Sequence, residues 1–257
     1  MSDGLNLGRG KMQLTPITAA VLVIGDEILS GRTQDTNTHY IANYLNQIGV
    51  DLCEARVVAD DEAEIVAAVN ALRHRYHYLF TTGGIGPTHD DITADAVARA
   101  FGVEIKEDAR ALTMLRERFS EAELNPARRR MARIPVGAEL VPNALSKAPG
   151  FWLGNVIVMA GVPAIMQSML DTVGQKLEVG ARMLVETVQA GAIAEGRYAM
   201  RLEEIAHQYV GVSIGSYPSF TSQGMRNQIV LRSRDMDLLE QAAQEVREMI
   251  LEITNLD

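Results

Sequence analysis

The segment Leu79-Phe-Thr-Thr-Gly-Gly-Ile-Gly-Pro-Thr-His-Asp-Asp-Ile-Thr93 runs from an apolar strand into a glycine loop and then into a helix. The apolar run from Tyr76 to Phe80 has the length of a core strand, and the glycines after it allow a tight turn close to a ligand. Thr93 is a favourable N-cap, and the apolar residues that follow it have helical spacing. The loop therefore ends at unpaired helix N–H groups, which favour a phosphate or another anion.

This loop matches neither of the common phosphate-binding fingerprints. It lacks the Gly-Lys-Ser/Thr end of a Walker loop, and its glycines do not have dinucleotide-fold spacing. Asp90 and Asp91 follow in the same loop, and they would repel an anion unless a metal ion, a proton or a neutral part of the ligand faced them. Alternatively, either aspartate merely caps the helix.

Composition restricts the classes of function. The chain has 257 residues, enough for a large α/β domain or for a main domain with a smaller one. Its formal net charge of -9 argues against general nucleic-acid binding, which uses clustered Lys and Arg. The single cysteine, Cys53, excludes an internal disulfide and fits a reducing cytoplasm, and we expect it to be buried in a strand. Since there is neither an apolar run of about eighteen residues nor a signal peptide, we expect a cytoplasmic protein without membrane contact.

Strands and helices alternate in the first half of the chain. Strands are predicted at 19–24, 50–58 and 76–80, with helices at 40–48 and 65–72 between them. This alternation is typical of right-handed βαβ units in a parallel sheet, so the fold class is α/β. The carboxyl ends of parallel strands meet at one edge, where open α/β sheets bind ligands. Three acidic pairs should therefore gather there: Asp26 and Glu27, Asp60 and Asp61, and Asp90 and Asp91.

A group of arginines follows in the second half, on a short helix that begins at Asn125-Pro126. These side chains are Arg128, Arg129, Arg130 and Arg133. They could clamp a phosphate over the site, or they could form a solvated helix face. We favour the solvated face, because closely spaced arginines on a helix cannot all point at one ligand.

Changes of pattern divide the chain into three parts. Residues 1–18 are predicted to be a flexible tail, and residues 19–175 form the main domain. A hairpin is expected at Gly154-Asn155, and Gly161-Val162-Pro163 should open a helix. Residues 181–257 read as a small α+β domain with the order βαββα.

Five ordered motifs carry a resemblance to a known family. They are Gly25-Asp-Glu-Ile-Leu-Ser-Gly31, Gln34-Asp-Thr-Asn37, Thr82-Gly-Gly-Ile-Gly-Pro-Thr-His-Asp-Asp-Ile-Thr93, Ala148-Pro-Gly-Phe151 and Gly161-Val-Pro163. Together they resemble the MoaB/MogA-like molybdopterin-binding domain, in its CinA-type branch, and the N-terminal domain of eukaryotic FAD synthases. The resemblance implies a three-layer parallel-sheet fold, in which the glycine loop faces the terminal phosphate of molybdopterin or the diphosphate of a nucleotide.

The resemblance also implies roles for individual residues. Asp60 and Asp91 match the acids implicated at MogA-type sites, and we take them as the catalytic candidates. The carboxylates that could hold a divalent Mg, Mn or Co ion are Asp26, Glu27 and Asp90. The phosphate-binding candidates are Thr82, Gly83, Gly84, Gly86 and Thr93.

Three functions are compatible with these assignments. The first is binding of a phosphorylated pterin or nucleotide, in molybdenum cofactor biosynthesis. The second is divalent-metal-dependent pyrophosphohydrolysis of ADP-ribose or FAD, in which His89 either assists proton transfer or orients a neighbour. The third is a non-catalytic regulatory protein. The expected partners are a small phosphorylated ligand and further copies of the chain, as a dimer or trimer.

Overall fold

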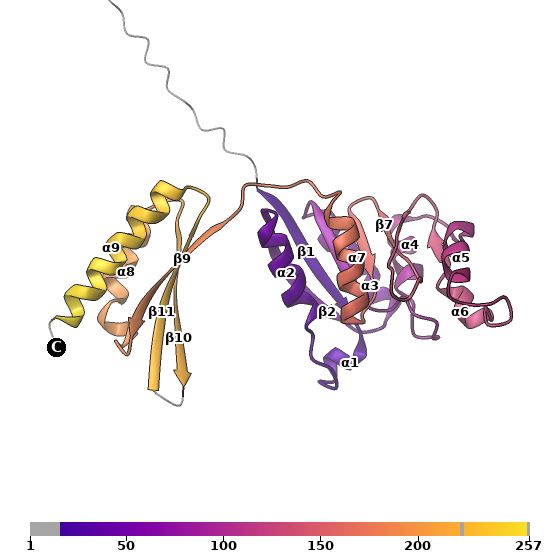
Figure 1. Ribbon diagram of the computed structural model, residues 1–257, viewed down its shortest axis with the longest axis horizontal. Coiled ribbons are helices and arrows are strands. Elements are labelled where there is room, and N and C mark those ends of the chain that lie inside the picture. The colour runs from indigo at the N-terminus through magenta and orange to yellow at the C-terminus, as the bar shows by residue number, and fades with distance from the viewer. Residues whose placement is uncertain (1–15, 222–223, 256–257) are drawn as a thin grey trace, which may run out of the picture. The chain divides into compact units, whose positions relative to one another are not determined.

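The structure is a computed structural model, and it describes residues 16–221 and 224–255 (Figure 1). The chain divides into two compact units, the first ending at Gly180 and the second beginning at Ala181. The first strand begins at Ile17, two residues before the predicted start. Residues 1–15 of the tail predicted over 1–18 lie outside the described residues.

A six-stranded sheet with the order β2-β1-β3-β8-β7-β6 forms the centre of the first unit. The strands are β1 (Ile17–Ile24), β2 (Val50–Val58), β3 (Tyr78–Thr82), β6 (Glu139–Val141), β7 (Gly150–Leu153) and β8 (Val156–Met159). The neighbouring strands β2, β1, β3 and β8 are parallel, whereas β7 is antiparallel to β8, and β6 is antiparallel to β7. The parallel sheet and the hairpin at Gly154-Asn155 are thus confirmed.

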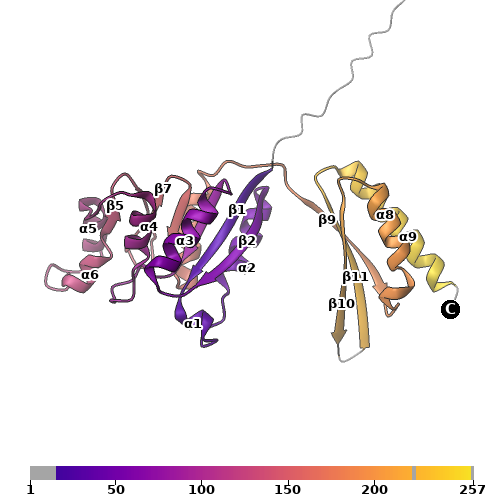
Figure 2. The ribbon, with the colours of Figure 1, turned by 180° about the vertical axis from the view of Figure 1, so that it is seen from behind.

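Helices cover both faces of this sheet. The helices α2 (Asn37–Gln47) and α7 (Pro163–Gly174) lie on one face (Figure 1), and α3 (Glu62–Arg73) and α4 (Thr93–Phe101) lie on the other (Figure 2). Both faces are apolar because alternate residues of β1 point into two separate cores. Leu22 packs with α3 and α4, and Val21 packs with α2 and α7. The prediction of a three-layer α/β fold is therefore confirmed.

Shorter elements complete the first unit. They are α1 (Asp26–Leu29), α5 (Ala109–Arg116), α6 (Pro126–Arg130), and the antiparallel pair β4 (Ile105–Glu107) and β5 (Arg133–Pro135). Glu107 ends β4, and the next residue, Asp108, caps α5 by accepting from the N–H groups of Arg110 and Ala111. Asn125 caps α6 by accepting from Arg128 N–H.

The expectation that Cys53 is buried is wrong. Cys53 lies on β2, an edge strand of the sheet, and it is exposed. The side chains of β2 alternate, so that Cys53, Ala55 and Val57 all face solvent. An edge strand is covered less completely than a central one, and an apolar run there does not guarantee burial.

The second unit has its own core and its own three-stranded antiparallel sheet, with the order β10-β11-β9. Its elements are β9 (Leu184–Gly191), the 3₁₀ turn η1 (Glu195–Arg197), α8 (Ala199–Gln208), β10 (Ser213–Thr221), β11 (Gly224–Ser233) and α9 (Met236–Thr254). Both helices lie on one face of the sheet, where Ile229, Leu231 and Val246 are fully buried (Figures 1 and 2).

Candidate functional site

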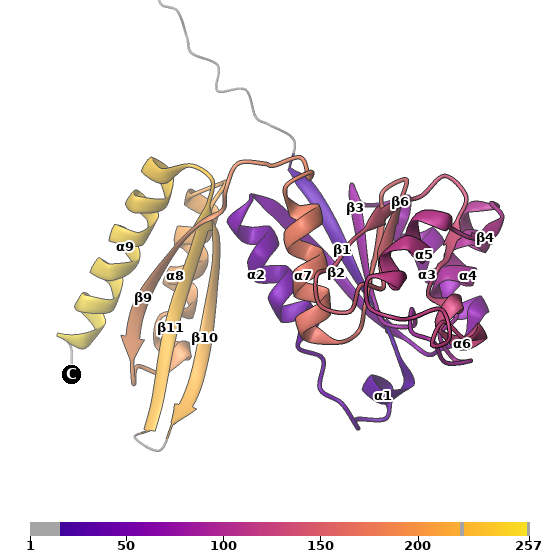
Figure 3. The same ribbon diagram turned by 45° about the vertical axis from the view of Figure 1, so that its right-hand side comes forward.

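The carboxyl ends of the four parallel strands form one edge of the first unit, where ligands bind in open α/β sheets. Figure 3 shows α1 beyond the end of β1 at this edge. Backbone hydrogen bonds tie neighbouring loops together here. Gly25 N–H donates to the Val58 carbonyl at 3.1 Å, and Gly83 N–H donates to the Met159 carbonyl at 3.2 Å. The loops after all four strands are therefore held next to one another.

The glycine loop is pressed against both the sheet and α4. Gly83 has a φ of +103°, and a Cβ placed on it would lie 2.1 Å from the Ile24 carbonyl oxygen. Gly84 has a φ of +66°, and its carbonyl accepts a hydrogen bond from Thr93 N–H at 3.0 Å. Position 83 requires glycine, because its positive φ and its close approach to the Ile24 carbonyl oxygen leave no room for a side chain.

Thr93 does not cap α4 as the sequence suggested. The helix begins at Thr93 itself, with Ile92 in the N-cap position. The fully buried Thr93 hydroxyl donates to the Gly83 carbonyl at 3.0 Å. Thr93 thus shapes the glycine loop from behind, and its hydroxyl proton is already engaged.

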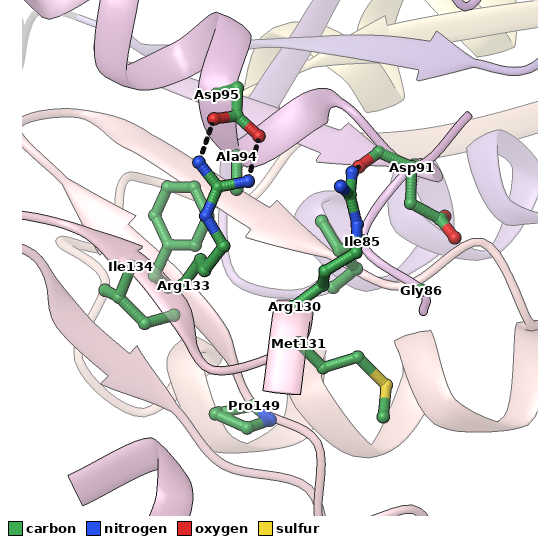
Figure 4. Close-up of a pocket in the computed structure, with 12 residues that line it drawn as sticks. Ile85, Gly86, Asp91, Ala94, Asp95, Arg130, Met131, Arg133, Ile134 and Pro149 are labelled. Carbon is green, nitrogen blue, oxygen red and sulfur yellow. Dashed lines mark hydrogen bonds and ion pairs between the residues drawn. The ribbon is translucent and has the colours of Figure 1, made fainter. Parts of the chain in front are cut away.

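Asp91 fixes the far end of the glycine loop. Its Oδ2 accepts hydrogen bonds from Thr88 N–H at 2.8 Å and from Thr88 Oγ1 at 2.6 Å, and it lies so close to Gly86 that a Cβ there would be 2.6 Å away. The Asp91 carboxylate points away from Arg130, whereas its carbonyl oxygen accepts from Arg130 Nη2 at 3.2 Å (Figure 4). The side chain of Asp90 remains 62% exposed. The two aspartates therefore have different environments.

Asp60 is the centre of the acidic residues at this edge. Its Oδ2 accepts from Asp26 N–H at 3.0 Å. Burial raises the pKa of Asp60; the Asp26 N–H acts against this, and the charges of Asp26, Glu27 and Asp90 raise it further. Asp61 has a different role, because it caps α3 through the N–H groups of Ala63 and Glu64. The alternative that Asp90 or Asp91 caps the helix after the glycine loop is wrong, because the N-cap residue of α4 is Ile92 and no side chain caps that helix.

The carboxylates predicted to hold a metal ion are Asp26, Glu27 and Asp90. Within residues 16–221 and 224–255, no group of three His, Cys, Asp or Glu side chains is arranged to hold a metal ion. The Glu27 carboxylate folds back over its own neighbour Gly25, at 2.5 Å from a Cβ placed there. Asp26 contributes its backbone N–H to Asp60, and Asp90 is largely exposed. What Asp26, Glu27 and Asp90 share is their proximity to Asp60, whose pKa their charges raise.

The raised pKa of Asp60 predicts a pH-dependent stability. The folded protein binds this proton more tightly than the unfolded chain, so the resulting stability is present below the ordinary Asp pKa of 3.8 and is lost as pH rises through the folded-state pKa. The Asp60→Asn variant retains an oxygen for the Asp26 N–H and has no titrating group. We expect it to lack that loss and to be more stable than the wild-type protein at pH 7. Urea unfolding of both proteins between about pH 3.5 and pH 7, the range in which carboxyl groups titrate, checks this prediction. The same dependence of stability on pH in the variant and the wild-type protein would contradict it.

The arginines differ in what they contact. Arg129 pairs with Glu107 at 2.5 Å, and Arg133 pairs with both oxygens of Asp95 at 2.5 and 3.0 Å (Figure 4). Arg128 lies over the Phe119 ring, near Glu123. Arg128 and Arg129 fit the solvated helix face that we favoured, whereas Arg133 lies on β5 and not on the helix.

Arg130 departs from that prediction. Its guanidinium has no carboxylate partner among the residues that the structure describes, and its buried Nε has no hydrogen-bond partner there. It lines a pocket together with Gly84, Gly86 and Asp91 (Figure 4). Sequence reasoning could not single out Arg130, because the carboxylates that neutralise its neighbours come from distant segments.

Thr82 ends β3 directly before the glycine loop. It is fully buried, and its Oγ1 has no hydrogen-bond partner among the described residues. The structure therefore places an unneutralised guanidinium beside the glycine loop and a buried hydroxyl directly before it. Such a combination can bind an anion by charge-assisted hydrogen bonds.

Comparison with known proteins gives a consistent assignment. A family described as "Probable molybdopterin binding domain" matches residues 20–178, and "FAD synthase, middle domain" matches residues 183–255. A CinA-like protein of Citrifermentans bemidjiense is 38% identical over 245 residues, covering 90% of this chain and 58% of that protein. A protein of Thermoplasma volcanium is 31% identical over 78% of this chain and 80% of its own length.

A solved structure supports the fold of the first unit. The crystal structure of CinA from Thermoplasma acidophilum, described as being of unknown function, has a TM-score of 0.59 at 34% sequence identity. It covers 62% of this chain and 96% of that one. Among the helices in the described parts of this chain, none has the length and apolar character needed to cross a membrane.

Proposed function

The chain belongs to the molybdopterin-binding-domain family, in its CinA-like branch, and we propose that its glycine loop binds the phosphate of a phosphorylated pterin or nucleotide. The observation that carries this proposal is Arg130, whose charge has no carboxylate partner among the described residues and which lines the pocket beside Gly84 and Gly86. Such a group favours an anion, because a guanidinium forms strong, directional hydrogen bonds to phosphate oxygens.

The local backbone supports the same ligand. The loop leads into α4, a nine-residue helix whose N-terminus favours negative charge. Asp91, which could have repelled a phosphate, has both hydrogen bonds of its Oδ2 directed to Thr88. In this arrangement the chain binds and orients the phosphate, and a pterin ligand would connect it to molybdenum cofactor biosynthesis.

The hydrolytic alternative needs a divalent cation, and the described carboxylates do not fit one as a three-ligand group. We therefore derive no hydrolytic step from this site. Three properties of the protein stay predictions: pyrophosphohydrolysis of ADP-ribose or FAD, a regulatory role, and assembly into a dimer or trimer. Each is compatible with binding at the glycine loop.

A ligand panel tests the proposal. Thermal unfolding of the full chain would be followed with inorganic pyrophosphate, ADP-ribose, FAD and 6-hydroxymethylpterin diphosphate, each with and without Mg or Mn. A ligand present at about 100 times its dissociation constant should add roughly 2.7 kcal/mol of stability. Adenosine should add none, because it has no phosphate. If no phosphorylated compound stabilises the protein, the proposal is wrong; release of AMP would establish the hydrolase instead.

A further inference from the structure

The carboxamide of Asn37, the first residue of α2, is partly unused. Asn37 is only 7% exposed, and its Nδ2 donates to the Gly161 carbonyl at 2.7 Å. Its Oδ1 is buried and has no hydrogen-bond partner among the described residues. An amide oxygen can only accept hydrogen bonds, so a ligand group that satisfies Oδ1 must be a hydrogen-bond donor.

The Asn37 carboxamide lies close to the glycine loop. Gly161 follows β8 and packs on the loop so tightly that a Cβ placed on it would be 3.2 Å from the Cα of Gly83. Asn37 is bonded to that same Gly161. The carboxamide is therefore separated from the phosphate-binding loop by the backbone of a single residue.

The backbone amides at the start of α2 are already used. Asp35 Oδ1 accepts from the N–H groups of Asn37 at 2.9 Å and Thr38 at 3.2 Å. These amides are therefore not available to bind a second anion. Among the described residues, the unpartnered polar groups at the start of α2 are side-chain oxygens.

Two further oxygens share this layer of the fold. Thr38 Oγ1, also in the first turn of α2, is buried with no partner among the described residues, and so is Thr82 Oγ1. Thr82 and Phe80 are on the same face of β3, because side chains alternate along a strand, and Phe80 packs in the core formed with α2 and α7. The unpartnered oxygens of Asn37, Thr38 and Thr82 thus all lie on the α2 side of the sheet.

We propose that Asn37 determines ligand specificity, with its Oδ1 accepting a hydrogen bond from a neutral N–H or O–H group next to the ligand phosphate. The inference rests on the proposed function of the loop. A sugar hydroxyl of a nucleotide and a ring N–H of a pterin both supply such a donor. A site that offers a buried acceptor discriminates against a ligand without the donor, because the acceptor would stay unpaired.

Binding selectivity tests this role. Dissociation constants of the wild-type protein and of Asn37→Ala would be measured for ADP-ribose, 6-hydroxymethylpterin diphosphate and inorganic pyrophosphate, which has no neutral donor. We expect Asn37→Ala to weaken binding of the organic ligand about tenfold, which corresponds to the loss of roughly one buried hydrogen bond. Binding of pyrophosphate should weaken by less than about twofold. The organic ligand that is weakened identifies whether the donor belongs to a sugar or to a pterin. If the alanine variant folds poorly, Asn37→Ser serves to compare the loss of affinity for the organic ligand with that for pyrophosphate.

Asn155→Ala is a matched control. Asn155 also uses its carboxamide Nδ2 to hold backbone carbonyls, those of Arg73 and Tyr76 at 2.8 and 2.9 Å, but it lies at the opposite end of β8. Its loss should leave the ratio of organic ligand to pyrophosphate unchanged. If Asn37 variants weaken all three ligands equally, or none, Asn37 is only structural and the inference fails while the loop proposal stands. If the wild-type protein binds none of the three, both fail together.

Discussion

Gly83→Ala is expected to destabilise the first unit by more than about 4 kcal/mol, or to prevent its folding. The φ of +103° costs any other residue roughly 1–3 kcal/mol of backbone strain. The new methyl group would also lie 2.1 Å from the Ile24 carbonyl oxygen. Ile24 cannot retreat, because β1 is hydrogen-bonded to a neighbouring strand on each side. The two costs add at one position.

Gly102→Ala provides the matched control for this prediction. Gly102 follows α4 with a φ of +65°, and a Cβ placed there meets no atom within 4 Å. Its substitution should cost only about 1 kcal/mol, the strain of a left-handed residue. Urea unfolding of both variants separates close contact from backbone conformation. Similar losses in the two proteins would mean that the packing of Gly83 against β1 is unimportant.

Arg130→Met should weaken binding of pyrophosphate and ADP-ribose between about 10-fold and 100-fold, since a hydrogen bond to a charged group contributes roughly 1.5–3 kcal/mol. Methionine keeps much of the apolar stem that packs in the pocket and removes only the guanidinium. Isothermal titration at about 0.1 M salt checks the prediction, because long-range effects of surface charge are then largely screened.

Arg129→Met removes the same charge from the adjacent position. Arg129 is already paired with Glu107, at 2.5 Å from one carboxylate oxygen and 2.7 Å from the other. We expect the loss of this charge to change ligand affinity by less than about threefold, because a guanidinium that is already paired with a carboxylate contributes little to binding a further anion. Equal losses in the two variants would show that general positive charge, rather than the position of Arg130, attracts the ligand.

The glycine loop was predictable because its signals are local. A strand-length apolar run, three closely spaced glycines and a helical pattern all lie within one stretch of chain. The location of Asp60 beside Asp26 was also expected, since carboxyl ends of parallel strands share an edge. The functions of individual polar groups were less accessible. Thr93 was expected to cap α4, but its hydroxyl donates to Gly83, because the loop folds back over the first helical turn.

The sequence by itself determined the α/β class, the parallel direction of the first three strands and the presence of a glycine loop between a strand and a helix, because periodicity and turn chemistry depend on near neighbours. Tertiary structure alone decided which charges and oxygens remain available at that loop. Arg129 and Arg133 are neutralised by Glu107 and Asp95, acids 22 and 38 residues away, whereas Arg130 meets a carbonyl. Asn37 reaches Gly161 across 124 residues. Pairing over such distances depends on how the strands and helices pack, and no local pattern encodes it.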